Sequence, residues 1–295
     1  MEIKEEIARR AEEIETIIAK YLPKECGYQK TVIEAMNYSI LAGGKRLRPM
    51  LMQETYRMFG GKSDVIEPFM AAIEMIHTYS LIHDDLPAMD NDEYRRGRKT
   101  THVVYGEAMA ILAGDALLNY AFETAASAFV LDEGNPAIGK AFMILASKAG
   151  IYGMIGGQVA DVESEGQEID AEKLKFIHIH KTSALLESAM LIGAVLAGAD
   201  EQQQRTVELA ARELGLAFQI RDDILDVTGN ADELGKPIGS DEKNQKNTYV
   251  ALEGIDKARE DVKRYSESAI NRLKSLPVKN EFLYELIEEL IERTN

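Results

Sequence analysis

The chain of 295 residues is acidic, with 34 Lys and Arg against 50 Asp and Glu and a formal net charge of −16 at pH 7. Its 45% hydrophobic and 28% charged residues are typical of a folded globular protein and exclude disorder as the main state. Such a negative chain repels phosphates at long range, which argues against nucleic acid as a partner. An anionic ligand would need a local cationic pocket or bridging metal ions.

The cysteine content and the hydropathy pattern indicate a reducing, aqueous compartment. The single Cys26 cannot form an internal disulfide. The charged segment 1–23 lacks the apolar stretch of a secretory signal. The longest uncharged, mostly apolar run, residues 189–199, is shorter than the roughly 20 residues that span a bilayer. We therefore expect a cytoplasmic protein without membrane insertion.

Apolar residues recur at helical spacing along most of the chain. In the first segment Ile3, Ile7, Ile14 and Tyr21 follow this spacing, and Pro23 ends the segment. We see no series of alternating strands with hairpin signals and no low-complexity linker. The pattern predicts an all-α fold in one large domain, residues 1–295. The predicted helices cover residues 2–21, 29–42, 49–59, 64–83, 101–130, 136–153, 171–198, 202–228, 248–274 and 280–293.

A first aspartate cluster, Asp84-Asp85-Leu-Pro-Ala-Met-Asp90, closes the apolar helix predicted over 64–83. Asp84 and Asp90 are six residues apart and cannot share a helical face. Pro87 must therefore end or kink the helix so that Asp90 can return toward Asp84. His77 lies about two turns before Asp84 on the same face, where a buried core histidine is the competing interpretation.

A second cluster, Asp222, Asp223 and Asp226, crowds one face of the helix predicted over 202–228. Carboxylates about 5.5 Å apart repel by roughly 3 kcal/mol at an effective dielectric of 20, so they require solvent or a cation. The apolar flanking residues argue against a merely solvated acidic face. Oxygen ligands without His or Cys favour Mg²⁺, which proteins commonly share with substrate phosphates.

Cationic residues gather in two predicted connections. The loop GGKRLRP, residues 43–49, places Lys45, Arg46 and Arg48 at the start of a helix, where an anion can bind. Residues 95–99 carry three arginines and a lysine just after the first aspartate cluster, and arginine suits phosphate oxygens. Pairing with the nearby aspartates, or plain solvation, is the alternative.

Together these motifs resemble the short-chain trans-prenyl diphosphate synthases and, within that family, the bacterial farnesyl diphosphate synthases. The resemblance implies the all-α isoprenoid synthase fold, a single bundle around a deep central cavity, and a homodimer. The matching motifs lie between roughly residues 40 and 250 and occur in the same order as in the family. The motifs are GGKRLRP (43–49), HTYSLIHDDLPAMDNDEYRRGRKTTH (77–102), GMIGGQVAD (153–161), HKT (180–182) and FQIRDDILDVTGNADELGKPIGSD (218–241).

The resemblance also implies roles for individual residues. Three Mg²⁺ ions, or Mn²⁺ as a substitute, would be held on the allylic diphosphate by Asp84, Asp85, Asp90, Asp222, Asp223 and Asp226. Contacts to the allylic substrate would come from Arg95, Lys181, Thr182, Gln219 and Lys236. Isopentenyl diphosphate would be held by Lys45, Arg48, His77 and Arg96. Gln158 and Asp161 match a motif that lines the same cavity.

The implied reaction joins isopentenyl diphosphate head-to-tail to dimethylallyl and then geranyl diphosphate. The catalytic residues would stabilise charge on the departing diphosphate: Asp84, Asp85, Asp90, Arg95, Lys181, Asp222 and Lys236. The four residues between the aspartates of the first motif are similar to those of short-chain synthases. Tyr79 and Ser80, five and four residues before Asp84, would meet the growing tail first. We expect farnesyl diphosphate (C15), with geranylgeranyl diphosphate (C20) as the alternative.

Two other classes remain open. A class I terpene cyclase shares the helical fold but normally lacks the paired aspartate motifs and an isopentenyl site. A non-catalytic helical subunit need not keep complete sets of aspartates and cations. Two departures from the family pattern stand out: Ser183 replaces a glycine after the Lys-Thr pair, and the last residues lack a basic tail.

Overall fold

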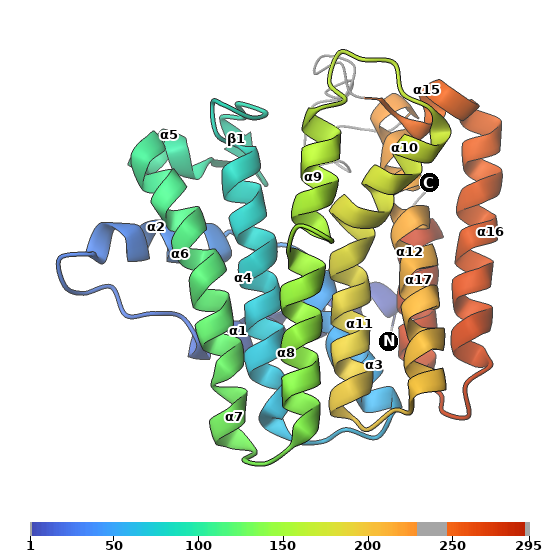
Figure 1. The fold of residues 1–295 in the computed structure, drawn as a ribbon, viewed down its shortest axis with the longest axis horizontal. Coiled ribbons are helices and arrows are strands. Elements are labelled where there is room, and N and C mark those ends of the chain that lie inside the picture. The colour runs from blue at the N-terminus through green and yellow to red at the C-terminus, as the bar shows by residue number, and fades with distance from the viewer. Residues whose placement is uncertain (1, 229–246, 293–295) are drawn as a thin grey trace. The chain divides into compact units, whose positions relative to one another are not determined.

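The computed structural model describes residues 2–228 and 247–292, which Figure 1 shows as a ribbon. The chain divides into two compact units. Unit 1 contains Met1–Ile3, Leu51–Lys62 and Pro136–Asn295, and unit 2 contains Lys4–Met50 and Ser63–Asn135. The described residues are helical except for connections and one small hairpin, so the predicted all-α fold is confirmed. The single domain and its central cavity stay predictions.

Unit 2 is built around the helix α4, Glu67–Asp84. This helix is apolar nearly all round, and residues 68–76 are all buried, as expected for a central helix. Helix α6 packs along it (Figure 1). The other elements of unit 2 are most of α1 (Ile3–Lys20), α2 (Lys30–Ile40), η1 (Asp64–Ile66), the strands β1 (Tyr94–Arg95) and β2 (Arg98–Lys99), α5 (Thr101–Tyr105), α6 (Glu107–Ala126) and α7 (Ala128–Leu131).

Unit 1 is built around α11, whose thirteen residues are all buried. Gly193 on α11 allows the backbone of α3 to pass closely, because a Cβ there would lie 2.3 Å from the Met52 carbonyl oxygen. Helix α12 packs against both α11 and α16. The elements are α8 (Pro136–Ala149), α9 (Met154–Val162), α10 (Ala171–Ile177), η2 (His178–Ser183), α11 (Ala184–Leu196), α12 (Glu201–Thr228), α15 (Tyr249–Glu253), α16 (Ile255–Lys274) and α17 (Glu281–Glu292). Helix α3 (Leu47–Met58) begins in unit 2 and continues into unit 1.

The helix boundaries differ from the prediction where glycines adopt a left-handed backbone. Gly106, with φ 85°, separates α5 from α6, and Gly254, with φ 83°, separates α15 from α16. Glycine adopts this conformation without the steric cost of a side chain, so each helix ends there. The apolar spacing continues across both glycines and therefore predicted one helix for each pair. Helix α9 was not predicted at all, because its glycine-rich start resembles a connection.

Three helical stretches in the described residues are long and apolar enough, by length and composition alone, to cross a membrane. They are Asp64–Asp84, Pro136–Val162 and Ala171–Leu196. The search of the sequence for a long uncharged run did not find these stretches, because a few charged residues interrupt each of them. Inside the protein, 78% of the apolar window is buried in the first and third stretches, but only 33% in the second.

Candidate active site

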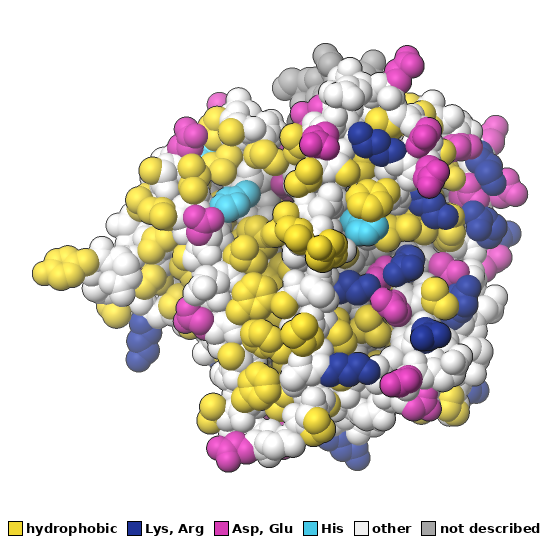
Figure 2. Space-filling view, in the orientation of Figure 1, with side chains coloured by type: hydrophobic (Ala, Val, Ile, Leu, Met, Phe, Trp, Pro, Cys, Tyr) yellow, Lys and Arg dark blue, Asp and Glu magenta, His cyan; other side chains and the backbone are white. Residues whose placement is uncertain are grey.

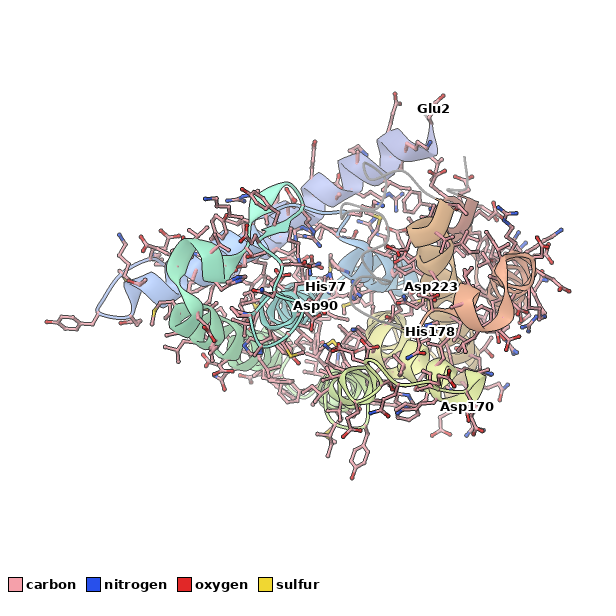
Figure 3. The ribbon with its side chains drawn as sticks, turned by 90° about the horizontal axis from the view of Figure 1, so that it is seen from above. Glu2, His77, Asp90, Asp170, His178 and Asp223 are labelled. Atoms are coloured by element: carbon pink, nitrogen blue, oxygen red, sulfur yellow. The ribbon has the colours of Figure 1, made fainter. Side chains whose placement is uncertain are left out.

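The first aspartate motif lies where α4 ends in unit 2. Helix α4 stops at Asp84, and the following turn contains Pro87. The Asp90 backbone N–H then donates to the Asp84 carbonyl oxygen at 2.9 Å. The turn therefore returns Asp90 to the end of α4, as the position of Pro87 predicts. Figure 3 shows Asp90 and His77 in this unit.

Asp85 is paired with an arginine of the β hairpin. The Nε and Nη2 atoms of Arg95, on β1, lie 2.7 and 2.6 Å from Asp85 Oδ1. The Asp85 side chain is 5% exposed, whereas that of Arg95 is 33% exposed. Burial raises the pKa of Asp85 to about 6, although the hydrogen bond and charge of Arg95 oppose this shift. The ion pair thus holds the cationic hairpin against the first aspartate motif.

Three of the four residues predicted for isopentenyl diphosphate influence one another electrostatically. The pKa of His77 lies well below 6.5, first because its imidazole is poorly solvated and then because of the positive charge of Arg48 and Arg96. The Arg96 guanidinium also donates to the Gly43 carbonyl oxygen. The fourth residue, Lys45, is exposed in the same loop. These four residues gather in unit 2, which favours the predicted grouping.

Arg46 does not fit the predicted anion-binding loop. Its side chain is only 1% exposed and forms an ion pair with Glu74 at 2.8 Å. The loop therefore presents Lys45 to solvent and turns Arg46 into unit 2. Helix α3 also begins at Leu47, two residues before Pro49, so Arg48 lies in its first turn.

The predicted chain-length residues both lie on α4. Tyr79 is 5% exposed, and its ring meets the ring of His83 edge to face, with centroids 5.8 Å apart. Burial, followed by the charge of Asp84, raises the pKa of Tyr79 to about 12. Ser80 is less buried and donates to the His77 carbonyl oxygen at 2.9 Å. The phenol of Tyr79 therefore stays neutral and packed in unit 2.

The second aspartate motif lies on α12 in unit 1, where hydrogen bonds connect several predicted residues. Thr182 Oγ1 donates to Gln219 Oε1 at 2.8 Å, and Gln219 Nε2 donates to Asp223 Oδ1 at 3.2 Å. The Tyr249 backbone N–H donates to Asp223 Oδ2 at 2.6 Å. His178 Nε2 lies 3.8 Å from the same oxygen, and Figure 3 labels His178 and Asp223.

The π-helix η2 positions Lys181 and Thr182. A π-helical turn often marks a functional site, and here Lys181 pairs with Asp161 of α9. Gly157 on α9 makes this approach feasible, since a Cβ there would lie 2.1 Å from the Lys181 backbone nitrogen. Ser183, which departs from the family pattern, is fully buried and packs against Gly215.

The remaining predicted residues are distributed as follows. Asp222 is half-buried and Asp226 is buried, both on α12, and Gln158 lies on α9. Lys236 lies outside the described residues. Within residues 2–228 and 247–292, no group of three or more His, Cys, Asp or Glu side chains is arranged to hold a metal ion by itself.

Sequence reasoning missed three residues that support these groups. His178 is buried, which lowers its pKa to about 4, and it lies beside Asp223. Tyr249 contributes its backbone N–H, for which the sequence carries no signal. Glu74 had a visible signal: it is an acidic residue within the apolar run of α4, and such a residue is rarely buried unless it is paired.

The family model described as polyprenyl synthetase matches residues 29–287. The chain belongs to this family. Its helical architecture and its two aspartate motifs agree with that membership.

Two curated relatives and one solved structure are similar to the chain over most of its length. The chain is 48% identical to the farnesyl diphosphate synthase of Geobacillus stearothermophilus, across 90% of this chain and 89% of that protein. It is 47% identical to the geranylgeranyl diphosphate synthase of Cyanophora paradoxa, across 84% and 82%. A crystal structure of a geranyltransferase from Helicobacter pylori, complexed with magnesium and isoprenyl diphosphate, superposes with a TM-score of 0.85 and 32% identity, covering 99% of this chain and 97% of that one.

Proposed function

We propose that the protein is a prenyltransferase that condenses isopentenyl diphosphate with dimethylallyl and then geranyl diphosphate to form farnesyl diphosphate. The observation that carries the proposal is the Asp85–Arg95 pair at the end of α4, beside the cation group around His77. Carboxylates and arginines at one helix end suit a diphosphate and its counter-ions. The similarity to farnesyl diphosphate synthases supports the same substrates.

The proposed first step breaks the bond between C1 of the allylic substrate and its diphosphate. The leaving diphosphate takes the electron pair, and Arg95, Lys181 and Lys236 stabilise its developing charge. The double bond of isopentenyl diphosphate attacks the allylic cation, and a proton is then lost. No side chain is required as the base, since the released diphosphate can accept this proton. Until it is attacked, the cation must be kept from water.

Mg²⁺ fits the chemistry of the donor set. The candidate ligands are carboxylates without His or Cys, and Mg²⁺ prefers oxygen ligands that it shares with substrate phosphates. When bound, the ions supply positive charge that stabilises the leaving diphosphate. We propose three ions, held by Asp84, Asp85, Asp90, Asp222, Asp223 and Asp226.

The allylic diphosphate and isopentenyl diphosphate are assigned to different groups of residues. Thr182 and Gln219, hydrogen-bonded to each other, join Arg95, Lys181 and Lys236 in the allylic group. Lys45, Arg48, His77 and Arg96 form the isopentenyl group, which contains no carboxylate. This second group therefore binds its diphosphate through cations and hydrogen-bond donors without a metal ion.

The C15 product is favoured over C20 because Tyr79 is large, neutral and buried five residues before Asp84. At 1.5 Å per residue it lies about 7.5 Å along α4 from that aspartate. A tail that follows the helix would meet its ring there. The relatives include both farnesyl and geranylgeranyl diphosphate synthases, so C20 remains the alternative product.

We also propose a homodimer in the cytoplasm. Apolar side chains are exposed on α6, including Ile111 and Leu112 at 41% and 49%, and Figure 2 shows apolar side chains over this helix. In unit 1, Met143 and Tyr152 are 67% and 86% exposed. Surfaces of this kind are typical of protein–protein contacts. Sedimentation at several protein concentrations tests the dimer.

The decisive experiment is a product assay with purified protein. Isopentenyl diphosphate is supplied with dimethylallyl or geranyl diphosphate, with Mg²⁺ or with EDTA, and the dephosphorylated products are sized by chromatography. A Mg²⁺-dependent C15 alcohol is the expected result. A C20 alcohol would support the geranylgeranyl alternative, and a cyclic hydrocarbon from one substrate would support a terpene cyclase. No product from the folded protein would favour a non-catalytic subunit.

A further inference from the structure

Arg46 is a buried cation within an otherwise accessible cationic loop. Its Nη1 donates to Glu74 Oε1 at 2.8 Å, its Nη2 donates to the Ile40 carbonyl oxygen at 2.6 Å, and its Nε donates to Glu15 Oε1 at 3.3 Å. The side chains of Arg46 and Glu74 are 1% and 3% exposed. The charge of Arg46 is therefore directed at the protein and is not presented to a ligand.

Besides Glu15 on α1, the contacts of Arg46 reach α2, α4 and the start of α3. Ile40 is the last residue of α2, where carbonyl groups lack helical partners. Glu74 lies on α4, three residues before His77. The Arg46 carbonyl oxygen accepts from the Met50 backbone N–H at 3.0 Å, which begins α3. One residue thus fixes the end of α2 and the start of α3 against α4.

The backbone at Arg46 is in the left-handed region, with φ 48°. This conformation is unfavourable for a non-glycine residue, so the contacts of the side chain must compensate for it. The loop thus buries Arg46 while it leaves Lys45, one residue earlier, exposed and Arg48 half-buried.

A second arginine holds the other side of the same loop. The Arg96 guanidinium donates to the Gly43 carbonyl oxygen, and a Cβ on Gly44 would lie 2.6 Å from Arg96 Nη1. Burial lowers the pKa of Arg96, and the negative charge of Glu74 opposes this shift. Glu74 therefore forms an ion pair with Arg46 and also attracts Arg96, which is predicted to bind substrate.

We propose that the Arg46–Glu74 pair is a positioning device for the isopentenyl diphosphate group. Arg46 does not touch the substrate; it fixes the loop so that Lys45, Arg48 and His77 face one diphosphate. This inference rests on the proposed function, because it assumes that these residues bind isopentenyl diphosphate. It assigns no role to Arg46 in binding the allylic substrate.

The main test is Arg46→Lys, which keeps the positive charge but loses the fork that reaches Ile40 and Glu15. Displacing binding groups by about 1 Å can reduce a rate by about a hundredfold, so we expect the KM for isopentenyl diphosphate to rise about tenfold or more. The KM for geranyl diphosphate should change less than about twofold. Arg57→Lys is the matched control, since Arg57 pairs with the buried Glu54 at the other end of α3.

A double variant, Arg46→Met with Glu74→Leu, separates positioning from stability. Replacing both partners of a buried pair by apolar residues often restores stability, so the thermal midpoint should stay near that of the wild type. The KM for isopentenyl diphosphate should nevertheless remain raised. If this variant regains both the midpoint and the wild-type KM, or if Arg46→Lys raises the KM values of both substrates equally, the inference is overturned.

Equilibrium binding distinguishes failure of the inference from failure of the proposed function. Isopentenyl diphosphate alone is titrated into the wild type and Arg46→Lys in EDTA by calorimetry. Binding to the wild type that weakens about tenfold in the variant supports the inference. Equal binding to both proteins overturns only the inference. No binding to the folded wild type overturns the proposed site, and the inference with it.

Discussion

The carboxyl group of Asp85 provides a quantitative test of the first aspartate motif. Its side chain is 5% exposed and paired with Arg95. Burial favours the neutral acid, whereas the pair favours the carboxylate. The structure indicates that burial prevails, since the pKa is raised from 3.8 to about 6. The variant Asp85→Asn removes the charge and keeps an oxygen that can accept from Arg95.

The shift fixes the sign of a pH effect on stability. Because the folded-state pKa lies above the unfolded-state value of 3.8, the folded protein binds the proton more tightly. This contribution is complete below the unfolded-state pKa and is lost as the pH rises through 6. With these two values, linkage gives about 1 kcal/mol more stability at pH 5 than at pH 7. Asp85→Asn cannot show this loss.

Urea unfolding in EDTA, at several pH values between about 5 and 8, measures the effect. The free energy of unfolding of the wild type, minus that of Asp85→Asn, should fall by about 1 kcal/mol across this interval. Asp256→Asn is the control, since that residue is exposed on α16 and its substitution reports the effect of deleting one negative charge at the surface. A difference that grows with pH would refute the reasoning, because the Arg95 pair would then outweigh burial.

Three further predictions concern single residues. His77→Gln should leave the shape of the pH profile of kcat/KM for isopentenyl diphosphate unchanged, because the pKa of His77 lies well below 6.5 in the free enzyme. An inflection near 6.5 that only the wild type shows would contradict this prediction. Tyr79→Ala should lengthen the product to C20 by chromatography, and an unchanged C15 product from folded protein would exclude Tyr79 as the floor. Gly157→Ala should raise the KM for geranyl diphosphate, since its Cβ would displace the Lys181 backbone. Gly139→Ala, with nothing within 4 Å of its Cβ, should not.

The sequence predicted what depends on local pattern. Helical periodicity identified the all-α fold, and Pro87 predicted the return of Asp90 that the Asp90–Asp84 backbone bond confirms. Periodicity could not identify the glycine breaks at Gly106 and Gly254, because a left-handed glycine interrupts a helix without changing its apolar spacing. Local pattern is sufficient for elements but not for their exact ends.

The roles of individual cations were harder to predict. Arg46 and Arg48 are two residues apart and chemically identical, yet one is buried against Glu74 and the other is half-buried near His77. The difference arises from one left-handed residue and from a partner 28 positions away. No local spacing carries that information. The same reason explains why His178 was not predicted beside Asp223.

Each aspartate motif begins with two adjacent aspartates. Helical geometry places the first and the second aspartate of a motif in different surroundings. Adjacent residues on a helix point about 100° apart, so both cannot face the same way. In each motif the second aspartate is the buried one: Asp85 is 4% and Asp223 3% exposed, and each accepts hydrogen bonds from the protein. The first aspartates, Asp84 and Asp222, are half-buried.

We therefore expect asparagine variants of the two positions to differ in their response to Mg²⁺. Asp222→Asn should raise the Mg²⁺ concentration for half-maximal activity about tenfold or more, because it removes an accessible carboxylate ligand. Asp223→Asn should raise the Mg²⁺ requirement less than Asp222→Asn does, because this carboxylate is buried and already accepts from Gln219 and the Tyr249 backbone. It should in addition raise the KM for the allylic substrate, because it loosens these two donors. Equal shifts in the Mg²⁺ requirement would contradict this expectation, because the protein donors would then leave Asp223 as available to the metal as Asp222, as a carboxylate with about four acceptor sites allows.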